Sequence, residues 1–297
     1  MKISKFFKAT GIITLLLVLY AVLQSLFTAG IFYLYNILKP ENAINLDDFD
    51  VSGLGSTGYM LFSLALVMSA LAMLLFLHLT RLFRLRKGIF TSIRIKPLLL
   101  STGLVYSSIF VLNIFVQWFP LEDHLETQFN GLSHNLLGVF SISILAPLLE
   151  EVLFRGAIQG YLMRHFKKPW VAIIISALIF GIYHMNPVQV VYATLLGIVL
   201  GWIYYRTGNL LSVIVGHILN NSMATFSMLF LSDAMDSDVA VSDGIINEII
   251  GGVHFGGLMA LSIFLAIKLH RSLPAVPKPW HESDEVPCKE SEQDALK

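Results

Sequence analysis

Residues 133–163, SHNLLGVFSISILAPLLEEVLFRGAIQGYLM, form a stretch that is apolar along most of its length. It is long enough to cross a bilayer, because about 20 mostly apolar residues span the hydrocarbon core. Yet it carries three charged side chains, Glu150, Glu151 and Arg155, and charges are rare and costly inside a membrane helix. The stretch therefore predicts a membrane-spanning helix and marks the place where function is expected.

The composition of the whole chain agrees with a membrane protein. Of its 297 residues, 56% are hydrophobic and 13% are charged, whereas soluble domains average about 45–50% apolar and about 25% charged residues. Lys and Arg balance Asp and Glu at twenty each, so the chain lacks the basic excess typical of nucleic-acid-binding proteins. Cys288 is the only cysteine, which excludes an internal disulfide. The composition thus argues against a soluble enzyme and against nucleic acid as a partner, and predicts membrane lipid as the surroundings.

Apolar stretches long enough to span the membrane recur along the chain and predict an all-α, polytopic helical bundle. There are eight of them, at 10–38, 58–80, 97–120, 133–163, 170–186, 188–205, 209–231 and 247–269. We expect three N-terminal helices within 1–132, a core over 133–269 that holds the intramembrane charges, and a disordered tail over 270–297.

The basic residues are distributed to one side of this predicted bundle. Eighteen of the twenty Lys and Arg residues fall on one side, Lys39 falls on the other, and Arg155 lies within a span. Because cytoplasmic loops retain Lys and Arg, we expect both termini to be cytoplasmic in a multi-pass protein of the plasma (inner) membrane.

The three intramembrane charges differ in their neighbours. Glu151 and Arg155 are four residues apart, so they share a helix face and can form an ion pair. Glu150 is rotated by about 100° from Glu151 and has no cation on its own helix. We therefore expect Glu150 to be the more reactive carboxylate, while the Glu151–Arg155 pair can equally be a folding clamp.

Polar side chains on two later spans can complete a site around Glu150. Phe180 and His184 share one helix face, and so do His217 and Asn221. From a rise of about 1.5 Å per residue, Glu150, His184 and His217 lie roughly 20, 21 and 12 Å from the cytoplasmic ends of their spans. All three depths are close to the midplane, so one polar pocket can join them, with Phe180 as a packing wall.

Two kinds of chemistry suit these residues. A carboxylate flanked by imidazoles and a carboxamide can activate water and donate hydrogen bonds to a developing oxyanion. Glu150, His184 and His217 with a water also match the three-ligand pattern of a catalytic zinc ion. The residues alone leave both mechanisms open.

At these positions the sequence resembles the CPBP family of intramembrane proteases, also called the Abi or type II CAAX prenyl endopeptidase family. Three of its motifs are matched in order across residues 133–231. They are Glu-Glu-x-x-x-Arg at Glu150, Glu151 and Arg155, Phe-x-x-x-His at Phe180 and His184, and His-x-x-x-Asn at His217 and Asn221.

The resemblance implies an intramembrane endopeptidase that cleaves a membrane-associated peptide or protein, either prenylated and CAAX-type or bacteriocin-like. It implies that Glu150 activates water, that His184 assists or binds a metal, and that His217 and Asn221 bind the metal or the oxyanion. It also implies supporting roles for Glu151 and Arg155. Both a zinc-dependent and a glutamate-dependent mechanism are compatible with it, and we favour the second.

Other classes of function are less well supported by the sequence. The chain contains neither His-Glu-x-x-His nor Gly-x-Ser-x-Gly, and no aspartate falls within a predicted span. The sequence therefore excludes the intramembrane protease mechanisms that depend on these residues. A proton-coupled secondary transporter would use Glu150 as a proton relay, but this sequence does not show the internal repeat symmetry expected of such a protein. A non-catalytic immunity protein that binds a peptide is the other alternative.

Overall fold

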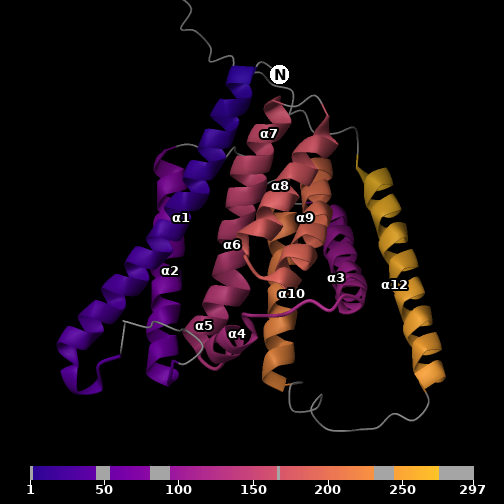
Figure 1. Ribbon diagram of the computed structural model, residues 1–297. Helices are drawn as coiled ribbons and strands as arrows, with labels where there is room; N and C mark the ends of the chain where they lie inside the picture. The colour runs from indigo at the N-terminus through magenta and orange to yellow at the C-terminus, as the bar shows by residue number, and fades with distance from the viewer. Residues whose placement is uncertain (1–2, 45–53, 81–93, 166–167, 231–243, 274–297) are drawn as a thin grey trace, which may run out of the picture.

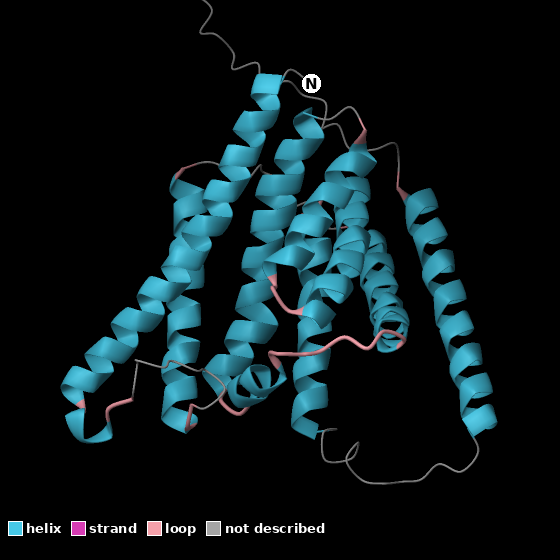
Figure 2. Ribbon diagram, in the orientation of Figure 1, coloured by secondary structure: helices cyan, strands magenta, loops and turns pink. Residues whose placement is uncertain are grey.

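The computed structural model describes residues 3–44, 54–80, 94–165, 168–230 and 244–273, and within these ranges every regular element is a helix (Figure 2). The predicted all-α fold class is therefore confirmed. The tail predicted over 270–297 lies outside the described residues from residue 274 onward, and the last helix continues to Ser272.

The helices follow one another with short connections. In chain order they are α1 (Ile3–Leu38), a short 3₁₀ turn η1 (Pro40–Asn42), α2 (Ser56–Leu79), α3 (Ile95–Gln117), α4 (Glu126–Ser133), α5 (Leu136–Phe140), η3 (Ser141–Leu145), α6 (Ala146–Glu150), η4 (Glu151–Gln159), α7 (Gly160–His165), α8 (Pro169–Tyr183), α9 (Pro187–Thr207), α10 (Leu210–Phe230) and α12 (Gly244–Ser272). The elements α5, η3, α6, η4 and α7 join end to end into a single rod, which we call the central rod (Figure 1).

Seven helical segments of the described chain are long and apolar enough to cross a membrane. The predicted fifth span differs, because its helix α8 has 15 residues and so reaches only about 22 Å. Figure 1 shows α8 ending partway along its neighbours, well before the lower ends of α2 and α10. The short span was predicted over 170–186; the helix ends at Tyr183, and Asn186 and Pro187 turn the chain back within the bundle.

The helices are arranged around the central rod (Figure 1). On one side α1 packs against α2, and on the other α12 packs against α3. Helices α8 and α9 form an antiparallel hairpin, and α10 contacts η3, α6 and η4. The rod that carries the intramembrane charges is thereby enclosed by the other spans.

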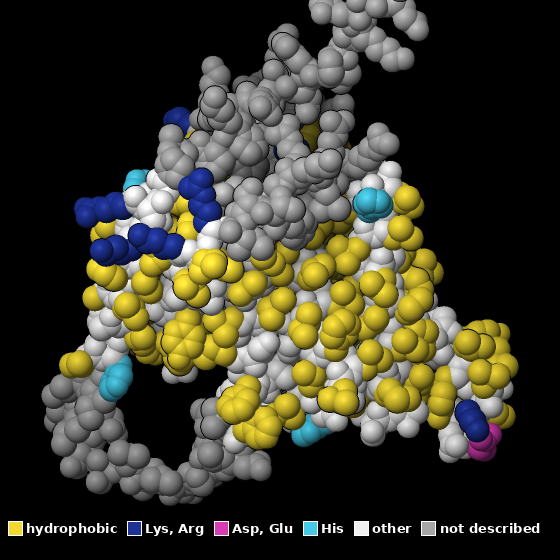
Figure 3. Space-filling view, turned by 180° about the vertical axis from the view of Figure 1, so that it is seen from behind, with side chains coloured by type: hydrophobic (Ala, Val, Ile, Leu, Met, Phe, Trp, Pro, Cys, Tyr) yellow, Lys and Arg dark blue, Asp and Glu magenta, His cyan; other side chains and the backbone are white. Residues whose placement is uncertain are grey.

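The outer surface is apolar, as expected for helices in lipid. Figure 3 shows hydrophobic side chains covering the face formed by α3 and α12, with most of the visible Lys and Arg residues gathered near one end. The loops 81–93 and 231–243, which contribute to the predicted orientation, lie outside the described residues, so the cytoplasmic placement of the termini stays a prediction.

Helices α8 and α9 approach each other closely because small residues face each other. Gly197 and Gly201 of α9 form a G-x-x-x-G pattern, which lets two helix backbones come together. A Cβ atom on Gly197 would lie 3.1 Å from the Cβ of Ala177, and one on Gly181 would lie 2.6 Å from the Val190 carbonyl oxygen. Since the second neighbour is backbone, no side-chain movement can make room at Gly181.

The substitution Gly181→Ala is expected to lower the free energy of unfolding by about 1–3 kcal/mol, because α8 and α9 must move apart. Chemical denaturation in detergent, followed by circular dichroism, measures the change. Gly30→Ala in α1 is the matched control, since its Cβ would meet no atom within 4 Å. Equal stability of the two variants would contradict the close approach of α8 and α9.

Candidate active site

The two adjacent carboxylates lie where the central rod changes its hydrogen-bond register. Glu150 ends the α-helical segment α6, and Glu151 begins η4, a π-helical segment that extends to Gln159. A second π segment, η3, precedes α6. Such i→i+5 segments within α-helices are rare and occur frequently at functional sites.

Glu151 and Arg155 form a fully buried ion pair. Arg155 Nη1 donates to Glu151 Oε1 over 2.8 Å, and the two side chains are 1% and 0% exposed. The guanidinium also lies over the Phe180 ring, 4.4 Å from its centroid. The predicted i,i+4 ion pair is thus confirmed, and it is enclosed by protein rather than facing lipid.

His217 of α10 joins both carboxylates. Its Nδ1 lies 2.7 Å from Glu151 Oε1 and its Nε2 lies 3.6 Å from Glu150 Oε2. Because the Glu151 carboxylate accepts hydrogen bonds, Nδ1 of His217 is the donor. The ring is thereby fixed with Nε2 toward Glu150.

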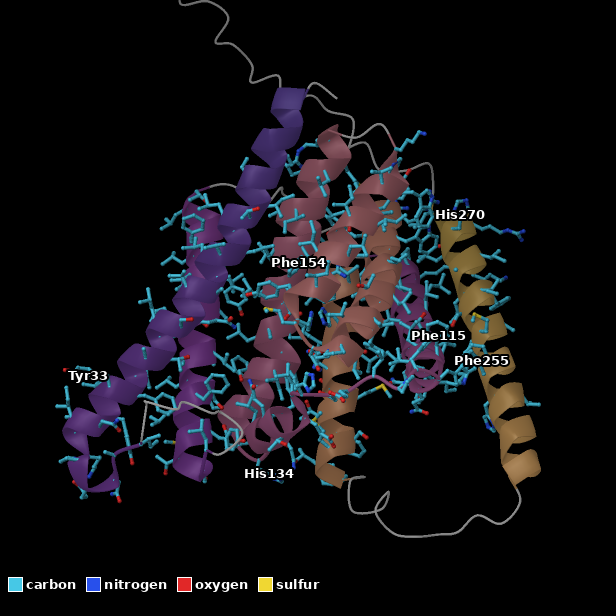
Figure 4. The ribbon with its side chains drawn as sticks, in the orientation of Figure 1. Tyr33, Phe115, His134, Phe154, Phe255 and His270 are labelled. Atoms are coloured by element: carbon cyan, nitrogen blue, oxygen red, sulfur yellow. The ribbon has the colours of Figure 1, made fainter. Side chains whose placement is uncertain are left out.

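Phe180 joins His184 to the same cluster. Its ring packs edge to face with His184 at 4.9 Å and with His217 at 5.7 Å between centroids. The Nδ1 atom of His184 lies 2.8 Å from the Phe180 carbonyl oxygen and must be the donor, which leaves Nε2 of His184 unbonded to its own helix. Figure 4 shows Phe154 inside the bundle, where it packs against Phe180 with centroids 5.0 Å apart.

Glu150 differs from Glu151 in its exposure. Its side chain is 15% exposed, against 0% for Glu151. Within the described part of the chain, its ion-pair partner is His217 and no Lys or Arg pairs with it. The phenols of Tyr20 and Tyr183, which stack at 5.9 Å, are close enough to interact electrostatically with Glu150. Glu150 is therefore the more accessible carboxylate of the pair.

The turn after His184 is held in place by the loop that follows α3. Met185 has a left-handed φ of 52°, and the fully buried Asn186 follows it. Asn186 Nδ2 donates to Asp123 Oδ1 over 2.9 Å, and its Oδ1 accepts from the His124 backbone N–H at 3.1 Å. These bonds fix the end of α8 and with it the position of His184.

The side chain of Asn221 joins α10 to the central rod. Its Nδ2 donates to the backbone carbonyl of Ile142 in η3 over 2.9 Å, and its Oδ1 accepts from Asn220 Nδ2 at 3.0 Å. Tyr192 of α9 in turn donates to Asn220 Oδ1 over 2.6 Å. One amide hydrogen of Asn221 is thus committed to the backbone of the central rod.

The donor set for the predicted zinc ion does not come together. Both imidazoles direct Nδ1 to an oxygen and leave Nε2 open, as metal-binding histidines do. However, no group of three or more His, Cys, Asp or Glu side chains in the described residues is close enough to hold a metal ion. Glu150, His184 and His217 as arranged therefore do not form a three-ligand site, and we derive no step through a metal.

Several residues around the site were not found from the sequence. Tyr20 comes from the first helix, far from the motifs, and its aromatic side chain was indistinguishable from a packing residue. Tyr192 and Asn220 carry no charge, and Asn220 looked like a neighbour of the motif residue Asn221. His134, by contrast, lies near the lower ends of the helices, away from the charged cluster (Figure 4).

Comparison with known proteins gives a family match over the residues of the three motifs, and a relative. Residues 132–223 match the family model "Type II CAAX prenyl endopeptidase Rce1-like". A stretch of 87 residues is 32% identical to the protein named "Putative membrane peptidase YdiL" of Bacillus subtilis (strain 168).

The extent of these matches is limited. The second covers 29% of this chain and 35% of that protein. No solved structure matches the chain. Still, the family match contains all three motifs, and it agrees with the resemblance seen in them. Residues 132–223 thus resemble the Rce1-like domain of type II CAAX prenyl endopeptidases.

Proposed function

We propose that this chain is an intramembrane endopeptidase in which Glu150 activates the water that hydrolyses a peptide bond. The substrate class is a membrane-associated peptide or protein, either prenylated and CAAX-type or bacteriocin-like. The proposal depends most on one observation, the partly exposed Glu150 carboxylate facing Nε2 of the buried His217. The match of residues 132–223 to the Rce1-like family supports the same reaction type.

In the proposed reaction, Glu150 takes a proton from water while the water oxygen attacks the carbonyl carbon of the scissile bond. The tetrahedral intermediate collapses, the C–N bond breaks, and the proton held by Glu150 passes to the leaving amine. The Nε2 atoms of His184 and His217 are the ring nitrogens left to meet water or substrate. We assign them to orienting the water and stabilising the intermediate.

The adjacent acids have separate roles in this proposal. Glu151 is committed to Arg155 and His217 and is shielded from water, so it holds its negative charge and fixes the His217 ring. Glu150 has no such pair with Lys or Arg among the described residues, so it is available to accept and release a proton. Zinc held by Glu150, His184 and His217 is the competing mechanism, and the spacing of these side chains favours the glutamate mechanism.

Replacing the proposed general base is the direct test of the function. Glu150→Gln is expected to lower kcat by about 10²–10⁴-fold, the usual contribution of a general base. The measurement is cleavage of prenylated and unprenylated peptides by the full chain in proteoliposomes. Glu122→Gln makes the same chemical change on a side chain that is 83% exposed and serves as the control. Unchanged turnover of Glu150→Gln would overturn the proposal, and peptide binding without cleavage in the wild type would indicate an immunity-type protein.

A second test separates the roles of the two acids through stability. Glu151→Gln leaves Arg155 buried without its counter-charge, which is expected to cost about 3–5 kcal/mol of unfolding free energy. Glu151→Gln combined with Arg155→Met should cost less than the sum of the single changes, since no buried charge is then left alone. Glu150→Gln should alter stability little. Additive effects in the Glu151–Arg155 cycle, measured by denaturation in detergent, would show that the pair does not act as a unit.

A third test addresses the metal. Under the glutamate mechanism, turnover stays unchanged after dialysis against a chelator and after addition of zinc. A metal mechanism predicts loss of turnover in chelator and recovery with zinc. The same peptides and proteoliposomes serve for this measurement, with a known zinc protease as the positive control for chelation. Recovery by zinc would replace the glutamate mechanism while keeping the endopeptidase assignment.

A further inference from the structure

Pro147 interrupts the backbone hydrogen bonds of the central rod three residues before Glu150. In the π-helical register of η3, the Ala146 N–H donates to the Ser141 carbonyl, five residues back. The next bond of this register would join residue 147 to the Ile142 carbonyl, but proline has no N–H. The carbonyl of the buried Ile142 therefore lacks its helical donor, which is costly in a bilayer.

Asn221 of α10 supplies the missing donor. Its Nδ2 lies 2.9 Å from the Ile142 carbonyl oxygen, at the point where α10 packs against η3. One turn further along α10, the hydroxyls of Thr225 and Ser143 lie 2.8 Å apart. Two polar contacts thus join the same pair of helices, but only the first involves the carbonyl that Pro147 leaves unpaired.

A directional chain of hydrogen bonds fixes which end of the Asn221 amide faces the carbonyl. The Tyr192 hydroxyl donates to the oxygen of Asn220, so the nitrogen of Asn220 faces Asn221. That nitrogen donates to the oxygen of Asn221, so the nitrogen of Asn221 faces Ile142. An amide turned the other way would place two acceptors together. The Ile142 carbonyl, which can only accept, therefore sets the orientation of Asn221, and Tyr192 completes the chain of hydrogen bonds from α9.

We propose that Asn221 is a positioning residue, which replaces the N–H missing at Pro147 and so fixes the segment that carries Glu150, and that Tyr192 supports its amide through Asn220. The proposal rests on the proposed function only in naming Glu150 as the base. It uses one amide hydrogen of Asn221 and leaves the second for the contact with the oxyanion that the resemblance implies. It requires that the effect of replacing Asn221 of α10 depends on whether residue 147 of α6 is a proline.

This coupling can be measured because Pro147→Ala restores a backbone N–H to the rod. In the wild-type background, Asn221→Ala is expected to lower the ratio of folded to unfolded protein by about tenfold or more, the effect of one unpaired buried carbonyl. It should also lower kcat of the folded enzyme. In the Pro147→Ala background both losses should shrink severalfold, since the helix then supplies its own donor.

Thr225→Val is the matched control for this cycle. It removes the contact to Ser143 and the hydrogen bond that Thr225 donates to the Asn221 backbone carbonyl. Neither involves the Ile142 carbonyl, so its effect should be the same with Pro147 or with Pro147→Ala. Tyr192→Phe removes the first donor of the chain and should lower kcat, with recovery in the Pro147→Ala background. Residues that only stabilise the fold are not expected to regain kcat when Pro147 is replaced by alanine.

The outcomes are distinct. If Asn221 acts only on the reacting atoms, Asn221→Ala loses kcat equally in both backgrounds and its loss of stability does not depend on Pro147, and the positioning role is overturned. Equal losses of stability in both backgrounds, measured by denaturation of the full chain in detergent, would also overturn it. If Glu150→Gln keeps full turnover, the proposed function fails, but the stability cycle between Asn221 and Pro147 is unaffected and still tests the structural coupling.

Discussion

One buried oxygen atom, Oε1 of Glu151, organises the polar centre of this bundle. It accepts from Arg155 Nη1 and from His217 Nδ1, at 2.8 and 2.7 Å. A charge at this depth is stable only with a partner and good geometry, because the desolvation of each ion costs several kcal/mol. The two donors come from the central rod and from α10, so the carboxylate fixes these two elements relative to each other.

The aromatic ring of Phe180 contacts Arg155 and both histidines of the site. Arg155 lies over the ring, and both imidazoles meet the ring at nearly right angles, 88° for His184 and 89° for His217. This arrangement needs α8 and α9 to be close, and the missing side chain at Gly197 allows it, since a Cβ there would lie 3.2 Å from Phe180 Cδ1. The small residues of the α8–α9 hairpin therefore serve the site as well as the fold.

The sequence was informative where a residue broke the pattern of its own helix. Charges in an apolar span revealed Glu150, Glu151 and Arg155, and helical spacing alone predicted the ion pair. What could not be predicted depends on how separate helices meet. The π register and the approach of Tyr20 to Glu150 are set by packing between elements. A single apolar sequence contains no signal for them, apart from Pro147, whose missing N–H implies a donor without naming Asn221.

The separation of two neighbouring carboxylates follows from helix geometry. Adjacent residues of a helix point about 100° apart, so a rod with one face toward the bundle interior must direct one acid inward and the other toward its margin. Glu151 takes the interior position with two donors, whereas Glu150 is 15% exposed and has only His217 at 3.6 Å as an ion-pair partner in the described part of the chain. The fixed charge of the Glu151–Arg155 pair orients His217, and His217 presents Nε2 to Glu150. A bundle of apolar helices can in this way enclose one carboxylate between two donors and leave its neighbour partly exposed at the margin.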